Sequence, residues 1–142
     1  MRFLIFEIFL VNLVIQNLPK IIQMTSNAFT CPPWINEFEG KVTICDKLGT
    51  IIYLNNKAIK NFEKEGGLKL IGTNIYSCHP EPSRTKLREL IENCETNVYY
   101  TIKNGERHLI YQSPLFDNGE YKWYAEFIFD IPEGTVTHVR ST

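Results

Sequence analysis

His79 is the residue whose setting most suggests chemistry, because Cys78 precedes it and Pro80 follows it just before an expected helix. An imidazole there could ligate a haem or a metal ion, or hydrogen-bond a polar ligand. The alternative, which we favour, is that His79 caps backbone groups in a tight proline-rich loop. A catalytic Cys-His pair is not expected, since adjacent side chains usually diverge and no third residue is placed to orient them.

The four cysteines do not indicate a structural metal site. They are widely spaced, with no CxxC pair and no Cys/His quartet at zinc-finger spacing. They are Cys31, Cys45, Cys78 and Cys94. We expect reduced and mostly buried thiols. No nucleophile-base-orienter set, phosphate loop or pair of carboxylates can be assembled from the spacings, so we expect a protein without catalytic machinery.

Glu126 and Asp130 lie among apolar neighbours in the last expected strand. Facing inward, Glu126 would need a partner, because a buried unpaired carboxylate is costly. We therefore expect Glu126 to point outward, to solvent. His108, in a neighbouring strand, is expected to be exposed or packed across the sheet, and His138 lies in the tail. Neither histidine is given a functional role.

Aromatic residues are concentrated in the last third of the chain. They include Tyr99, Tyr111, Tyr121, Trp123 and Tyr124. Such a stripe resembles a stacking platform for bases, but no cluster of Lys or Arg accompanies it and the formal net charge is -1. Nucleic acid is therefore not an expected partner. The stripe indicates either cross-strand packing or an exposed sheet face at which two proteins pair.

The first half of the domain that positions these residues begins with a hairpin. Residues 41–46 and 50–54 are rich in β-branched side chains, and Gly49 between them can adopt a positive φ. Asn55 or Asn56 can then cap a short helix, because a side-chain oxygen satisfies a free amide in the first turn.

The second half begins with a longer helix after Pro80-Glu81-Pro82, whose apolar residues recur at helical spacing. Three strands are then predicted, at residues 97–103, 107–113 and 121–131. Asn104-Gly105 and Asn118-Gly119 favour a positive φ at both turn positions and so predict tight type I′ hairpins. The chain is 142 residues long and 44% hydrophobic, which suits one packed core.

An apolar run from Phe3 to Ile22 precedes this domain. A signal peptide or membrane span is disfavoured, because Glu7 interrupts the run and no small-residue cleavage site follows. Two alternatives remain: Met24 is the true start, which we favour, or the run is an amphipathic helix that pairs two copies.

Four segments carry a family resemblance. They are Val42-Thr43-Ile44-Cys45-Asp46, Gly49-Thr50-Ile51-Ile52-Tyr53-Leu54-Asn55, Ile71-Gly72-Thr73-Asn74 and Cys78-His79-Pro80-Glu81-Pro82. With the aromatic terminal hairpin, they resemble the small PAS-domain proteins of anaerobic and Gram-positive bacteria. The resemblance implies an α+β fold, in which helices pack on one face of a five-stranded antiparallel sheet and a ligand is held between the two layers.

The resemblance implies sensing but leaves the cofactor unknown. Flavin-binding light sensors of this family resemble the chain with a cysteine where Ile75 stands, so a flavin-cysteine photocycle lacks its nucleophile. Oxygen-sensing haem PAS domains carry their proximal histidine near the position of Leu87, so a haem bound in that manner has no axial ligand here.

We therefore predict a non-catalytic, cytoplasmic PAS sensor at residues 31–133, between an apolar extension at 1–30 and a flexible tail at 134–142. Its pocket is expected to bind an unidentified small molecule. The expected binding residues are His79, Cys78, Tyr111, Ile52, Leu54, Phe62 and Leu87. The expected protein partner is a second copy or a separate effector, and neither nucleic acid nor a membrane is expected. The alternatives are a haem- or metal-binding redox or gas sensor that uses His79, and a ligand-free dimerisation module.

Overall fold

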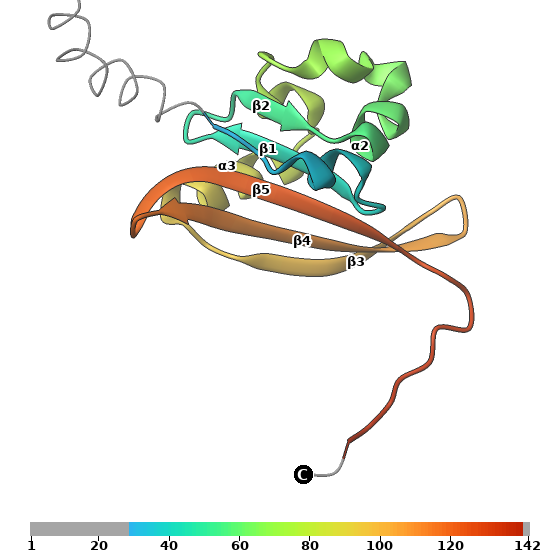
Figure 1. Ribbon diagram of the computed structural model, residues 1–142. Helices are drawn as coiled ribbons and strands as arrows, with labels where there is room; N and C mark the ends of the chain where they lie inside the picture. The colour runs from blue at the N-terminus through green and yellow to red at the C-terminus, as the bar shows by residue number, and fades with distance from the viewer. Residues whose placement is uncertain (1–28, 141–142) are drawn as a thin grey trace, which may run out of the picture. The chain divides into compact units, whose positions relative to one another are not determined.

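Strands from the two ends of the described residues, 29–140, join into one antiparallel sheet in this computed structural model (Figure 1). The strands are β1 (Lys41–Asp46), β2 (Ile51–Leu54), β3 (Asn97–Lys103), β4 (Glu106–Asp117) and β5 (Glu120–Ile131). β5 pairs with β1, so the spatial order is β2-β1-β5-β4-β3. The predicted five-stranded antiparallel sheet is confirmed. The apolar run from Phe3 to Ile22 and the alternative start at Met24 lie outside the described residues.

Both turns of the β3-β4-β5 meander have the predicted backbone. Asn104 and Gly105 have φ values of 55° and 82°, and Asn118 and Gly119 have 49° and 79°. Positive φ at both central residues matches the right-handed twist of the flanking strands. These turns set the register of the three strands, and the register places the inward-facing side chains of neighbouring strands beside one another.

β4 is longer than the predicted 107–113 and continues through Pro114. The last pair between β3 and β4 is Asn97↔Gln112. Beyond Gln112, β4 pairs with β5 on one side and, among the described residues, has no strand on the other. Pro114 therefore lies where β4 is an edge of the sheet, and an edge strand tolerates a residue that lacks a backbone N–H. The sequence pattern alone does not show where β3 stops covering β4.

The helices that follow β2 pack on one face of the sheet. They are α2 (Asn56–Asn61), η2 (Glu63–Glu65), η3 (Gly67–Leu70), η4 (Ile75–Cys78) and α3 (Ser83–Asn93), where η marks a 3-10 turn. The first turn, η1 (Pro33–Glu37), lies toward the opposite face, where Asn36 Oδ1 accepts a hydrogen bond from the Tyr53 hydroxyl at 2.7 Å. Cys45, Leu54 and Tyr124 from the sheet meet Ala58 and Ile91 from the helices in the core. Among the described residues, no helix is long and apolar enough to cross a membrane.

Asn55 connects the first hairpin to the helices and is fully buried. Its Oδ1 accepts hydrogen bonds from the backbone N–H groups of Ala58 and Val42, both at 3.0 Å. Its Nδ2 donates to the carbonyl oxygens of Phe38 at 3.1 Å and Gly40 at 2.8 Å. Asn55 is thus the cap of α2, and it also fixes α2 to β1.

Candidate functional site

A cavity of about 290 Å³ lies between the helices and the sheet. Most of its lining is apolar, with a few polar side chains among the apolar ones. The lining residues are Thr43, Ile51, Leu54, Phe62, Glu65, Leu70, Ile75, Cys78, His79, Tyr99, Ile110, Glu126 and Ile128. An apolar cavity with a few convergent polar groups is the usual form of a small-molecule site.

Glu126 on β5 faces this cavity, so the expectation that it points outward is wrong. It pairs with Thr43 on β1 and with Gln112 on β4, and these neighbours lie on the same face of the sheet. Gln112 Nε2 donates a hydrogen bond to Glu126 Oε2 at 2.7 Å, and Gln112 Oε1 accepts one from Asn97 Nδ2 at 2.9 Å. A row of polar side chains therefore crosses the inner face from β1 to β3, and we call it the polar row. It consists of Thr43, Glu126, Gln112 and Asn97.

Only one of the two oxygens of Glu126 is engaged by the protein. Oε1 accepts no hydrogen bond from a described residue, yet no buried polar side-chain atom of the described residues lacks a partner. Oε1 is therefore open to the cavity. Burial raises the pKa of Glu126, and the hydrogen bond from Gln112 and the charge of His79 oppose that rise.

His79 follows η4 and has one nitrogen occupied by the backbone. Its Nδ1 lies 2.9 Å from the carbonyl oxygen of Ile75. A carbonyl can only accept, so Nδ1 carries a hydrogen, and Nε2 is the ring nitrogen that this backbone contact does not engage. Arg84 Nε donates to the carbonyl oxygens of Tyr76 and His79, both at 2.9 Å, and so holds the loop. His79 thus makes the backbone contact predicted for it and also lines the cavity.

The structure brings four of the predicted binding residues together at the cavity: His79, Cys78, Leu54 and Phe62. Leu87 is buried in the core and lines a neighbouring hollow of about 380 Å³, which shares His79 and Tyr99 with the cavity. Ile52 is not among the lining residues, because its neighbour Ile51 takes the inward position on β2.

Tyr111 lies on the opposite face of the sheet, so its prediction as a pocket residue is corrected. It pairs with Phe127 on β5 and with Val98 on β3, one position away from the inward-facing Gln112. Successive residues of a strand point to opposite faces, which excludes Tyr111 from the cavity that Gln112 and Glu126 approach.

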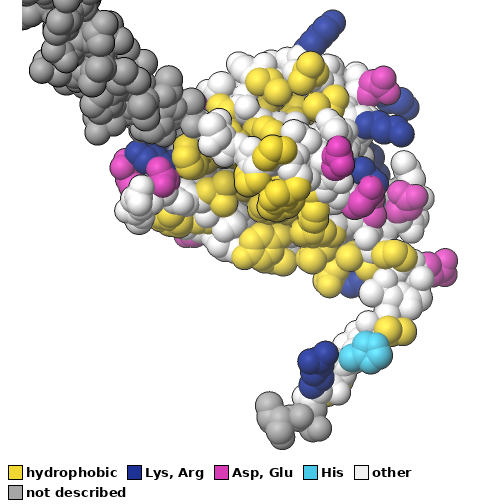
Figure 2. Space-filling view, viewed as in Figure 1, with side chains coloured by type: hydrophobic (Ala, Val, Ile, Leu, Met, Phe, Trp, Pro, Cys, Tyr) yellow, Lys and Arg dark blue, Asp and Glu magenta, His cyan; other side chains and the backbone are white. Residues whose placement is uncertain are grey.

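The aromatic stripe is divided between the two faces. Tyr121 and Tyr124 point inward, and their hydroxyls donate to the carbonyl oxygens of Ile91 at 3.0 Å and Glu95 at 2.8 Å. The outer face has exposed apolar side chains from β3 and β4, namely Val98, Tyr100, Ile102 and Tyr111. Hydrophobic side chains gather over the strands in Figure 2. This face is a candidate surface for protein pairing.

The cysteines differ in burial more than the sequence indicates. Cys45 is buried in the core, where desolvation raises the pKa of its thiol to about 12. Cys78 is exposed and lies at the cavity. Cys31 and Cys94 are half-buried, so the predicted mostly buried set of thiols is wrong: Cys45 is the one buried cysteine, and Cys78 is exposed because η4 turns its end toward solvent.

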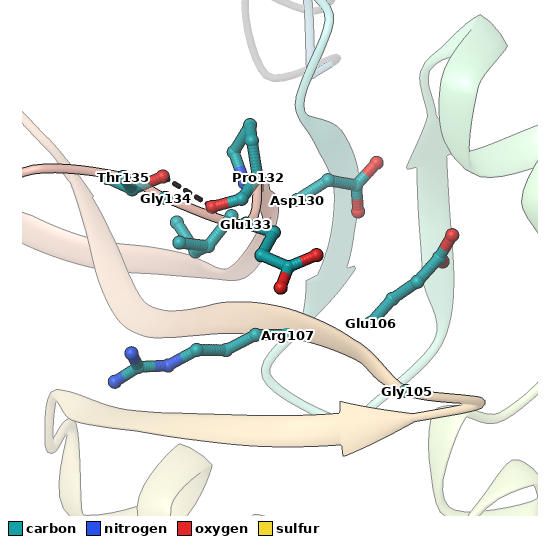
Figure 3. Close-up of a pocket in the computed structure, with 9 residues that line it drawn as sticks. Gly105, Glu106, Arg107, Asp130, Pro132, Glu133, Gly134 and Thr135 are labelled. Atoms are coloured by element: carbon teal, nitrogen blue, oxygen red, sulfur yellow. Dashed lines mark hydrogen bonds between the residues drawn. The ribbon is translucent and has the colours of Figure 1, made fainter.

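A wider hollow, of about 670 Å³, lies where β4 begins and β5 ends. Figure 3 shows the Arg107 side chain extending away from the carboxylates of Glu106 and Glu133. Arg107 instead stacks on Tyr100, at 3.9 Å from the ring centroid. Asp130 is bonded to Lys41 and to His108. Because these side chains do not converge, the hollow is a weaker candidate site than the helix-sheet cavity.

Sequence reasoning missed the polar row, although each strand gave a signal. Thr43 and Glu126 are each flanked by apolar residues in their own strand, and Gln112 follows the apolar stretch Leu109-Ile110-Tyr111. Their alignment depends on the register between distant strands, which one strand's pattern cannot give.

Comparisons with known proteins agree with this geometry. No family model matches the chain, and no curated protein resembles it in sequence. The PAS domain of BvgS from Bordetella pertussis superposes with a TM-score of 0.54 and 16% identity, over 71% of this chain and 83% of that one. A sensory box sensor histidine kinase from Vibrio cholerae gives 0.51 and 12%, over 86% and 98%.

The Aer2 receptor from Vibrio cholerae, described as a dual PAS-heme oxygen sensor, also resembles the chain. It superposes with a TM-score of 0.55 and 22% identity, over 66% of this chain and 95% of that one. At such identities the likeness concerns the fold. The chain has the PAS fold, as its strand order and the helical layer over the cavity already indicate.

Proposed function

We propose that this chain is a non-catalytic sensory module that binds a small molecule in the cavity between the helices and the sheet. One observation carries the proposal: Glu126 is held inside a mainly apolar cavity, with one carboxylate oxygen fixed by Gln112 and the other left open. Glu126 is half-buried, and a carboxylate withdrawn from water among apolar side chains destabilises a fold unless it is paired. A charged side chain placed among apolar ones costs stability, and residues that cost stability in this way are concentrated at functional sites.

Signal transfer would be a shift between conformations of the elements that enclose the cavity. The cavity has a sheet wall, which includes Thr43 and Glu126, and a helical wall, which includes Phe62 and His79. A ligand that contacts both walls favours the arrangement in which they lie at the right separation. The output would pass to a second copy or to a separate effector at the outer face.

Native mass spectrometry of the chain purified from its own host tests this proposal. We expect an additional small mass that is retained under gentle conditions and lost on denaturation. A thermal-shift screen of small molecules should then identify compounds that raise the melting temperature. Protein that carries no extra mass, and that no compound stabilises, would count against a sensory cavity.

A haem- or metal-binding sensor is the second candidate, and the orientation of His79 favours it. An imidazole that ligates a metal through Nε2 commonly donates its Nδ1 hydrogen to a carbonyl, as His79 does to Ile75. His79 is the residue that would hold a haem iron, and the haem would supply gas or redox sensing. No cluster of three or more His, Cys, Asp or Glu able to hold a metal ion occurs among the described residues. The cavity of about 290 Å³ favours a smaller ligand.

Absorption spectroscopy separates these two candidates. A Soret band that disappears in His79→Ala, and persists in His108→Ala, would support the haem sensor. The His108 variant is a matched control, because that ring bonds to Asp130 on the sheet, at 2.9 Å. Protein that stays colourless after incubation with haem favours the small-molecule sensor.

A ligand-free dimerisation module is the third candidate, and it depends on the exposed apolar side chains of the outer face. A dimer that native mass spectrometry finds without a ligand, and that no compound stabilises, would favour it. A monomer with a retained small molecule would favour the sensory cavity and a separate effector.

A further inference from the structure

The charges around the helix-sheet cavity have a consistent sign. Glu126 and Glu65 contribute carboxylates to its lining, and no Lys or Arg of the described residues lines it. His79 is the lining side chain that can carry a positive charge. An anionic ligand would bring its charge toward two carboxylates, one at the mouth and one among apolar side chains, and this repulsion costs free energy. The lining therefore selects against anions.

The two carboxylates lie at different depths. Glu65 belongs to η2 and is exposed, so it lies at the mouth. Glu126 lies on the sheet wall, beneath the helices, with apolar side chains such as Ile110 and Ile128 beside it. A ligand that reaches Glu126 must bury an apolar body against those side chains while it presents a polar group at its inner end.

The polar row determines which chemical group the inner end of the ligand must have. Asn97 donates to Gln112 Oε1, which turns the Gln112 amide so that its Nε2 donates to Glu126 Oε2. Glu126 Oε1 then remains as an acceptor that faces the cavity, and the hydroxyl of Thr43 lies on the same wall. An acceptor inside an apolar cavity requires a donor, and a charged donor gives the stronger bond.

We propose that the ligand of this cavity is a small organic amine, whose protonated nitrogen donates to Glu126 Oε1 and whose apolar body lies against Leu54, Ile110 and Ile128. The assignment rests on the proposed function, since it names the chemistry of the ligand in the same cavity. Ammonium and carboxylate neutralise each other where water cannot solvate either one well. The cavity volume of about 290 Å³ limits the body to roughly the size of one aromatic ring with a short chain.

Three probes with one apolar body test the assignment: phenethylamine, 2-phenylethanol and phenylacetate. Calorimetric titration of the full chain at pH 8 should rank the amine first and the acid last. In Glu126→Gln the amine should bind at least about tenfold more weakly, while the alcohol keeps its affinity within about threefold. Glu89→Gln, which makes the same charge change on the exposed side of α3, should bind all three probes like the wild type.

The outcomes separate the two proposals. Equal binding of the three probes, a preference for phenylacetate, or unchanged amine affinity in Glu126→Gln would overturn the amine assignment and leave a binding cavity in place. If none of the three probes binds and the native protein carries no extra mass, both the amine assignment and the sensory cavity are overturned. Circular dichroism of each variant excludes misfolding as the cause of a lost affinity.

Discussion

Gln112 fixes the orientation of Glu126, because its Nε2 donates to one carboxylate oxygen at 2.7 Å while its Oε1 is held by Asn97 at 2.9 Å. Four residues further along β5 and on the same face, Asp130 bonds to Lys41 and to His108. The pKa of Glu126 is raised by burial, whereas the pKa of Asp130 is lowered chiefly by its hydrogen bond from Lys41. The protein thus pairs one inward carboxylate with the Lys41 ammonium and leaves the other with an amide, that of Gln112, as its hydrogen-bond donor.

Glu126→Gln should stabilise the ligand-free protein at pH 8. A folded-state pKa above the unfolded value means that the fold favours the protonated acid. The contribution of Glu126 to stability is therefore complete below the unfolded pKa and is lost as pH rises through the folded pKa. Glutamine has no charge to bury and can still accept from Gln112, so we expect a gain of about 1 kcal/mol in the free energy of unfolding. Urea unfolding at pH 5 and pH 8 measures it, and the gain should grow with pH.

Asp130→Asn is the matched control, since it removes a carboxylate from the same face of the same strand. The pKa of Asp130 is lowered in the folded state, so its contribution is present above the unfolded pKa and is lost as pH falls through the folded pKa. Asp130→Asn should therefore lower stability at pH 8, modestly because its side chain is 52% exposed, and the deficit should shrink in acid. If both variants lose stability at pH 8, the carboxylate of Glu126 does not destabilise the fold and the prediction is wrong.

The affinity for phenethylamine should rise with pH below the folded pKa of Glu126. A protonated Glu126 must lose its proton before it pairs with an ammonium, so the affinity should change by up to about tenfold per pH unit there and level off above it. The other titratable groups that line the cavity are Glu65, Cys78, His79 and Tyr99.

Two variants show which side chain causes the pH dependence of the phenethylamine affinity. Glu126→Gln should remove the part due to the carboxylic acid, and His79→Ala should leave it. Calorimetry in two buffers of different ionisation enthalpy would detect the proton that Glu126 releases on binding. An affinity that falls as pH rises from 5 to 8 would contradict the predicted ion pair.

Asn55→Ala should destabilise the fold by about 3 kcal/mol. The buried amide makes four hydrogen bonds, to β1, to α2 and to the segment after η1, and each is worth roughly 1 kcal/mol or leaves a buried group unsatisfied. Asn56→Ala changes the next residue, which is exposed on α2, and should cost less than about 0.5 kcal/mol. Chemical unfolding measures both, and similar losses would show that Asn55 is an ordinary cap.

Local chemistry in the sequence predicts most of the fold but only a minority of the cavity lining, namely Leu54, Phe62, Cys78 and His79. Asn104-Gly105 and Asn118-Gly119 fix their turns because few other residue pairs tolerate positive φ twice. Glu126 and Tyr111 were assigned to the wrong faces for one physical reason. β4 and β5 are apolar on both faces, since Ile110 and Ile128 point inward while Tyr111 and Phe127 point outward, so alternation does not reveal which face is which. Only the register with β1 and β4 determines them.

Ile102→Lys tests whether the outer face pairs two copies of the chain. Ile102 is 76% exposed on β3, beside the exposed Tyr100 and Val98, so a lysine there adds charge to the apolar face without entering the core. We expect the wild type to sediment as a dimer at a concentration at which this variant is a monomer. Leu48→Lys is the matched control, because Leu48 is 77% exposed in the β1–β2 turn, away from that face. A wild type that stays monomeric at high concentration would instead assign the outer face to a separate effector.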